Sequence, residues 1–77
     1  MDDKRKQEYK MIGLIISYYK KLKEITQLQL AEQININRTH MSNIEAPNMP
    51  TSISLDTLFD IADTLEVPVA SLLDFNR

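Results

Sequence analysis

The side chains of this sequence best suited to specific chemistry lie between Asn37 and Glu45. Met41 and Ile44 follow Asn37 by four and seven residues, so a helix here would bury both of them. The polar residues left off this apolar stripe are Arg38, Thr39, Ser42 and Asn43. An arginine can donate two parallel hydrogen bonds to guanine O6 and N7, and an asparagine can pair in a similar way with adenine. Taken alone, an exposed arginine is more often an ordinary solvated side chain. The function of these four residues therefore has to be judged from the sequence around them.

The composition offers little that would support catalysis. The chain has no cysteine, and its single histidine, His40, is predicted on an exposed turn without the partners that a nucleophile requires. One histidine cannot build a metal site alone, and a single glycine excludes a glycine-rich phosphate cradle. Asp56, Asp60 and Asp63 share one predicted helix face, but such a row is usually a solvated surface. We expect no enzymatic activity, no metal site and no cofactor.

The first element that must position these side chains is a long helix near the N-terminus. Acids suit its first turn and lysines its last, so the helix is expected to begin as early as Asp3 and to end near Lys23. Gly13 indicates close backbone packing, because a glycine inside a helix costs about 1 kcal/mol relative to alanine. The main apolar stripe consists of Tyr9, Ile12, Ile16, Tyr19 and Leu22. A second stripe, which something should cover, consists of Met11, Leu14, Ile15 and Tyr18.

Two short helices joined by a tight turn are predicted next. Thr26 and Gln29 fit a capping box, so the second helix should begin after Thr26. It should stop at Asn35, because asparagine tolerates the left-handed conformation that often ends a helix. Asn37 then caps the third helix.

The remainder of the chain predicts a loop and two further helices. Residues 46–54 contain two prolines among small polar residues, a composition typical of a loop. Ser54 can cap a fourth helix, and Pro68 interrupts the chain before a short fifth helix that ends near Phe75.

The order of these motifs resembles the phage-repressor family of helix-turn-helix proteins, of Cro and CI type or Xre-like. The blocks that carry the resemblance are ITQLQLA at 25–31, ININRTHMSNIE at 34–45, LFDIA at 58–62, LEV at 65–67 and LL at 72–73. The resemblance implies an all-α, compact five-helix, lambda-repressor-like DNA-binding domain. We expect a basic N-terminal extension of the first helix at residues 1–10 and a helix-turn-helix domain at residues 11–77, with its motif at residues 26–45.

The resemblance also assigns roles to individual residues. It places base contacts in the third helix, at Arg38, Thr39, Ser42 and Asn43. Contacts to the DNA backbone are expected at Gln27, Asn37, His40 and Asn48. Lys20 would form a structural ion pair with Glu45, and dimer contacts would come from Leu72 and Phe75. The expected partners are double-stranded DNA, with a palindromic operator, and a second copy of the chain.

The sequence departs from the family pattern in ways that leave two functions open. Ala46 and Pro47 replace the usual glycine after the third helix, the loop at residues 46–54 has no lysine or arginine, and Glu66 stands where a glycine often ends the fourth helix. Residues 1–24 contain seven basic and four acidic residues, whereas residues 46–77 contain five acidic residues and one basic residue. The main hypothesis is a sequence-specific regulator, a dimeric repressor or autoregulator, whose recognition helix is similar to that of restriction-modification controller proteins. The alternative is a helical interaction module or antitoxin-like domain with little DNA affinity.

The sequence gives no indication of a membrane protein. The longest apolar run, residues 14–16, is far shorter than the roughly 20 residues that span a bilayer. The acidic pair Asp2 and Asp3 also argues against a signal peptide. We expect a cytoplasmic protein with no membrane partner and no evident small-molecule effector.

Overall fold

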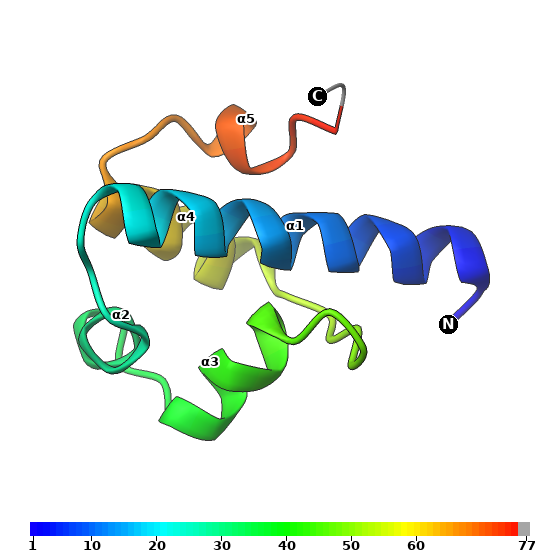
Figure 1. Cartoon of the computed structure of the whole chain (residues 1–77), viewed down its shortest axis with the longest axis horizontal. Coiled ribbons are helices and arrows are strands. Elements are labelled where there is room, and N and C mark those ends of the chain that lie inside the picture. Colours follow the sequence, from blue (N-terminus) through cyan, green and yellow to red (C-terminus); the bar gives the residue numbers. More distant parts are fainter. Residues whose placement is uncertain (76–77) are drawn as a thin grey trace.

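The computed structural model describes residues 1–75, which fold as five helices and contain no strand (Figure 1). The helices are α1 (Asp3–Leu22), α2 (Gln27–Gln33), α3 (Arg38–Glu45), α4 (Leu55–Leu65) and α5 (Val69–Leu72). The predicted all-α, five-helix architecture is confirmed, although α5 is shorter than expected and ends before Phe75.

The long helix α1 runs through the middle of the molecule, and α3, α4 and α5 pack directly against it. Figure 1 shows α2 and α3 on one side of α1 and α5 on the other, while α1 contacts α3, α4 and α5. The largest fully buried side chains are Ile16, Leu30, Met41, Ile61, Leu65 and Leu72. Because these residues come from all five helices, the core closes only when every helix is in place.

The starts of the three middle helices are fixed by local side-chain caps. Thr26 Oγ1 accepts a hydrogen bond from Gln29 N at 3.1 Å, and Gln29 Oε1 accepts one from Thr26 N at 2.8 Å. Asn37 caps α3 by accepting from His40 N, and Ser54 caps α4 by accepting from the backbone nitrogen of residue 57. The three predicted caps are therefore confirmed, each satisfying backbone donors that the first turn of a helix leaves free.

Left-handed residues end α2 and α4. Asn35 has φ 59° and turns the chain between α2 and α3, while Ile36 N donates to Ala31 O at 3.0 Å. Glu66 has φ 56° and follows the last residue of α4. The expected left-handed turn at Asn35 is confirmed, and Glu66 holds the same backbone region without the freedom of glycine.

Gly13 marks the closest approach of α1 to α3. A Cβ atom at this position would collide with the backbone carbonyl oxygen of Ile44, so only glycine lets the two backbones meet here. The close packing predicted for Gly13 is thus confirmed.

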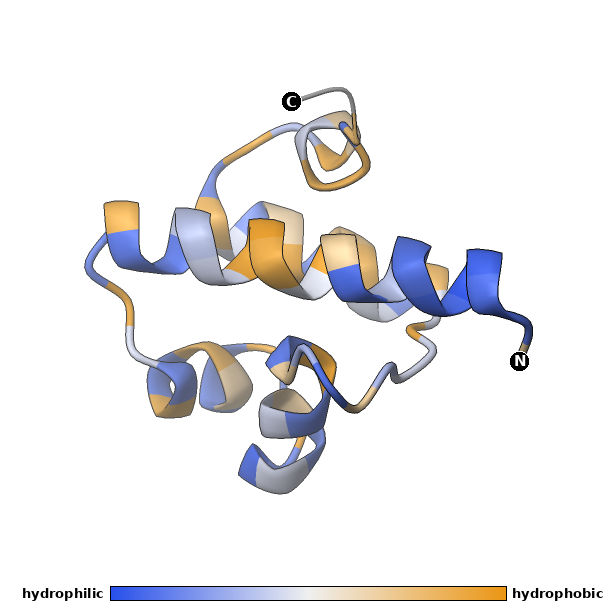
Figure 2. Ribbon diagram, turned by 45° about the vertical axis from the view of Figure 1, so that its right-hand side comes forward, coloured by the Kyte–Doolittle hydropathy of each residue, from blue (hydrophilic) through white to orange (hydrophobic). Residues whose placement is uncertain are grey.

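The second apolar stripe of α1 is covered only in part. Ile15 is buried in the core, whereas Leu14 and Tyr18 remain 43% and 52% exposed. Figure 2 shows the middle of α1 as hydrophobic and its N-terminal turns as hydrophilic, in keeping with a core that surrounds only the middle of the helix. α1 itself continues without a break across the boundary predicted at residue 10.

Candidate nucleic-acid interface

The polar face of α3 is turned outward by the burial of its apolar residues. Met41 and Ile44 are 0% and 2% exposed and fix the rotation of the helix about its axis. The opposite face leaves Arg38, Thr39 and Ser42 exposed and Asn43 half-buried. α3 lies at the outer edge of the molecule, on the other side of α1 from α5 (Figure 1).

A shallow surface hollow of about 330 Å³ joins α3 to the start of α2, and we call it the reading hollow. Its lining residues are Gln27, Arg38, Thr39, Ser42 and Asn43. The structure therefore brings together all four side chains predicted to contact bases and one predicted to contact the DNA backbone. The other three predicted backbone contacts lie outside this lining: Asn37 and Asn48 are exposed, and His40 is half-buried.

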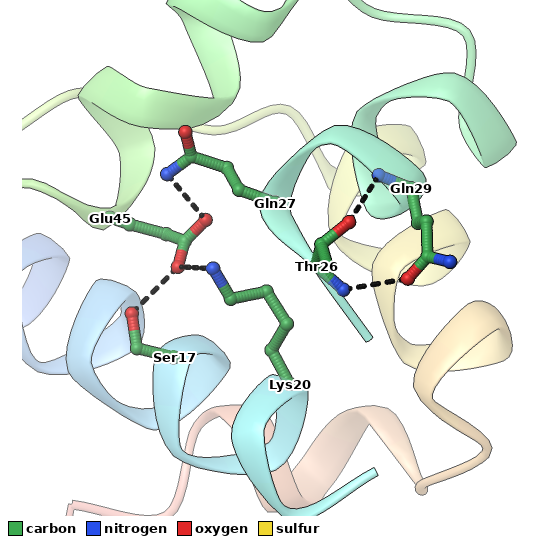
Figure 3. A network of polar contacts seen from close by, with 6 residues as sticks. All are labelled: Ser17, Lys20, Thr26, Gln27, Gln29 and Glu45. Carbon is green, nitrogen blue, oxygen red and sulfur yellow. Dashed lines mark hydrogen bonds and ion pairs between the residues drawn. The ribbon is translucent and has the colours of Figure 1, made fainter. Parts of the chain in front are cut away.

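A buried carboxylate, that of Glu45, ties three helices together beside the reading hollow (Figure 3). Lys20 Nζ lies 2.8 Å from Glu45 Oε1, which is the ion pair that the resemblance implied. Ser17 Oγ donates to the same oxygen at 2.7 Å, and Gln27 Nε2 donates to Glu45 Oε2 at 3.1 Å. We call these four residues the Glu45 network. It joins α1, α2 and α3 through the last residue of α3.

The Glu45 network is largely shielded from solvent. The side chains of Lys20 and Glu45 are 12% and 7% exposed. A charge pair at this depth is costly to desolvate, and it is tolerated when further hydrogen bonds satisfy the remaining acceptor sites, as Ser17 and Gln27 do here. Sequence reasoning missed Ser17, although its position three residues before Lys20 places both on one face of a helix.

Comparison with known proteins decides the family. A model described as the Cro/C1-type HTH DNA-binding domain matches residues 16–77, most of the chain. The chain belongs to this family. The HTH-type transcriptional regulator SinR of Bacillus subtilis (strain 168) is 36% identical over 64 residues, which cover 83% of this chain and 57% of that relative. The chain thus matches little more than half the length of this relative, and no solved structure matches it significantly.

The described residues place the basic side chains unevenly around this Cro/C1-type domain. Lys21 and Lys23 are exposed at the end of α1 that leads into α2. Lys4 and Arg5 are exposed toward the opposite end of α1, about 25 Å away along the helix, and Arg5 is paired with Glu8. The exposed cations nearest in sequence to the reading hollow are therefore Arg38, which lines it, and Lys21 and Lys23 at the end of α1.

The structure corrects one of the two residues predicted at a dimer interface. Leu72 is fully buried, because α5 is a single turn that inserts this side chain into the core against α4. Leu72 therefore presents no surface to a partner. Phe75 is half-buried and lines a groove of about 380 Å³, which we call the α1–α4 groove. Its other lining residues are Arg5, Glu8, Tyr9, Ile12, Ile53, Leu55, Leu58 and Leu73.

No helix among the described residues is both long enough and apolar enough to cross a membrane.

Proposed function

We propose that this Cro/C1-type domain is a sequence-specific transcriptional regulator, a repressor or autoregulator, that places α3 in the major groove of double-stranded DNA. The observation that carries the proposal is the reading hollow, which four polar side chains of α3 line together with Gln27 at the start of α2. The printed name of the relative, a transcriptional regulator, supports the same function. An α-helix fits the major groove, where each base pair presents a distinct pattern of donors, acceptors and methyl groups.

Each residue of the hollow has a chemical role in this proposal. The guanidinium of Arg38 pairs with guanine O6 and N7, and the amide of Asn43 pairs with adenine N6 and N7. Thr39 offers a methyl group to thymine, and the Ser42 hydroxyl serves as donor or acceptor. The DNA backbone is held from several directions by Gln27, Asn37, His40 and Asn48.

A homodimer on a palindromic operator completes the proposal. One recognition helix reads too few base pairs for useful specificity, and a two-fold dimer presents two of them about one helical turn apart. With Leu72 excluded, the best-placed dimer surface is the rim of the α1–α4 groove, where Leu55 and Leu73 are 66% and 43% exposed beside Phe75.

Selection from a pool of random double-stranded DNA at two salt concentrations tests this function. A selected palindrome, with affinity that falls as salt rises, is the expected result, because Lys and Arg contacts release counterions from phosphates. Arg38→Ala should relax the preference at one base pair, which binding through phosphates alone would not do. Binding with no sequence preference, or none at all, would contradict the proposal.

Two observations favour a second candidate, a helical interaction module with little DNA affinity. The loop from residue 46 to 54 carries no lysine or arginine, and residues 46–77 are acidic overall. A module of this kind would bind no DNA in the selection experiment at either salt concentration and would show no salt dependence.

A further inference from the structure

One side of α1 leaves large apolar side chains in water. Ile16 points into the core, and Leu14 and Tyr18 lie two positions before and after it, on the opposite side of the helix. Leu14, Tyr18 and Leu22 follow one another at steps of four positions and are 43%, 52% and 60% exposed. We call this row the α1 outer face. Neighbouring exposed apolar side chains mark a surface that meets another molecule, so this face needs an occupant.

Lysines line one edge of the α1 outer face. Lys10 precedes Leu14 by four positions and Lys21 follows it by seven, so both lie beside the apolar row. Lys21 is exposed and Lys10 half-buried, and neither forms an ion pair with any residue from 1 to 75. Two such faces placed together would bring lysines against lysines, which opposes association. The charge of this face therefore favours an acidic occupant over a second α1 outer face.

The outward side of α4 carries the opposite charge. Its exposed members, which we call the α4 outer face, are Asp56, Phe59, Asp60 and Asp63. Each of the three acids lies two positions from Leu58 or Ile61, which are buried, so the acids point away from the core. α4 contains no lysine or arginine, and in the described part of the chain none of these acids forms an ion pair. The acids therefore repel one another along the helix until a cation from outside meets them.

The two outer faces look in opposite directions. α1 lies in front of α4 in Figure 1, and the two helices contact each other on the sides that hold their buried residues. A two-fold pair of molecules cannot join both faces at once when these lie on opposite sides, so any contact between them is head to tail. The faces also agree in length, since residues 14–22 span about 12 Å of helix and residues 56–63 about 10 Å.

We propose that copies of this chain associate head to tail, with the α1 outer face of one copy packed on the α4 outer face of the next. The apolar row of α1 packs on Phe59, and Lys10 and Lys21 lie against the aspartates. This inference goes beyond the proposed function. The dimer proposed there uses the α1–α4 groove and stops at two copies, whereas a head-to-tail contact leaves a free face at each end and adds further copies.

Sedimentation of the whole chain is the first test. At low salt the average mass should rise past two copies as the concentration enters the high micromolar range. In about 0.5 M salt, which screens exposed charge pairs, it should return to two copies or fewer, so that only the groove dimer remains. A mass that stays at one or two copies at low salt would overturn the proposal, and so would growth that salt does not reduce.

Exchange of charges between the two faces is the second test. Lys21→Glu and Asp60→Lys should each lower the head-to-tail association constant about tenfold, because each places like charges together. Both substitutions in one chain should restore growth, because opposite charges face each other again. Lys23→Glu is the matched control: Lys23 is exposed beyond the last residue of α1, and the substitution changes the net charge as Lys21→Glu does. A combined variant that associates no better than either single variant would overturn the pairing of these faces.

Removal of apolar surface without a change of charge is the third test. Leu14→Gln with Leu22→Gln should abolish growth past two copies, whereas Leu28→Gln, at a residue 47% exposed on α2, should not. All three side chains are exposed, and circular dichroism checks that each variant is folded. Undiminished growth of the double variant would overturn the role of the α1 outer face.

The outcome is independent of DNA reading. A chain that selects no DNA sequence but grows past two copies as described would overturn the proposed function and leave this inference standing. A chain that selects a palindrome but stops at two copies at low salt would overturn this inference alone.

Discussion

The α2–α3 side of the molecule and the α1–α4 groove are built on opposite principles. On the first side a buried carboxylate satisfies donors from two helices, and Gly13 brings the α1 backbone onto α3. On the second side the helices leave apolar side chains such as Leu55 and Leu73 in solvent. The contrast teaches that directional hydrogen bonds and an ion pair hold the α2–α3 side together, whereas apolar side chains of the α1–α4 groove are left uncovered. The following substitutions test whether this division is real.

Removal of Glu45 should have the largest effect on stability. Glu45→Ala leaves Lys20 as a nearly buried ammonium without its counter-charge, so the free energy of unfolding should fall by about 3 to 5 kcal/mol. Urea unfolding followed by circular dichroism measures this loss. Glu32→Ala, on the exposed face of α2, is the control and should change stability by less than about 0.5 kcal/mol. A loss below about 1 kcal/mol for Glu45→Ala would mean that the network holds nothing in place.

Gly13→Ala should have the next largest effect on stability. The added Cβ meets the Ile44 carbonyl oxygen, a backbone atom that cannot rotate away, so α1 and α3 must separate. We expect a loss of about 1 to 3 kcal/mol despite the better helix propensity of alanine. Thermal unfolding checks this, with Lys21→Ala as an exposed control on the same helix. A variant more stable than wild type would show that the crossing of α1 and α3 is looser than the structure has it.

Glu66→Gly should stabilise the protein, by a smaller amount. Glu66 adopts φ 56°, a region that costs a residue with a Cβ atom and that glycine enters freely. We expect a gain of about 1 kcal/mol in the free energy of unfolding, seen as a higher melting temperature. The matched control is Asp63→Gly inside α4, where glycine lacks this advantage and should cost about 1 kcal/mol instead. Equal effects at the two positions would contradict the backbone explanation.

Charging the α1–α4 groove should leave the stability of the monomer nearly unchanged. Leu55→Lys with Leu73→Lys alters side chains that are already 66% and 43% exposed, so unfolding should shift by less than about 0.5 kcal/mol. On the proposed function, sedimentation should show a dimer for the wild type and a monomer for this double variant. Leu28→Lys, equally apolar and 47% exposed on α2, should keep the dimer. A wild-type chain that remains monomeric at high micromolar concentration would remove the dimer from the proposed function.

Local features of the fold could be predicted because their causes lie within a few residues. The caps at Thr26, Asn37 and Ser54 each bond to a residue three positions ahead. The turn at Asn35 depends only on the tolerance of asparagine for a positive φ. Hydrophobic spacing likewise identified the inward face of α3.

The parts that sequence reasoning missed depend on contacts across the fold. Ser17 meets Glu45 across 28 positions and Gln27 meets it across 18, so neither bond is visible in local spacing. The family resemblance places Leu72 at a dimer surface, and a one-turn helix shows too little periodicity to reveal that this side chain instead enters the core. The gathering of Gln27 with the α3 side chains followed only from the family resemblance.

The shortness of α3 determines in which state of the chain its polar face exists. An isolated helix of eight residues is unstable in water, since helices shorter than about 12 residues do not offset their cost of nucleation. α3 therefore exists only while docked on α1 and α2, and it forms in the same cooperative step as the core. Every molecule that unfolds loses the reading hollow at once, so only folded chains can provide the DNA binding proposed above. Amide hydrogens of Met41 and Ile44 should then exchange with solvent at the rate of global unfolding rather than by fraying of α3.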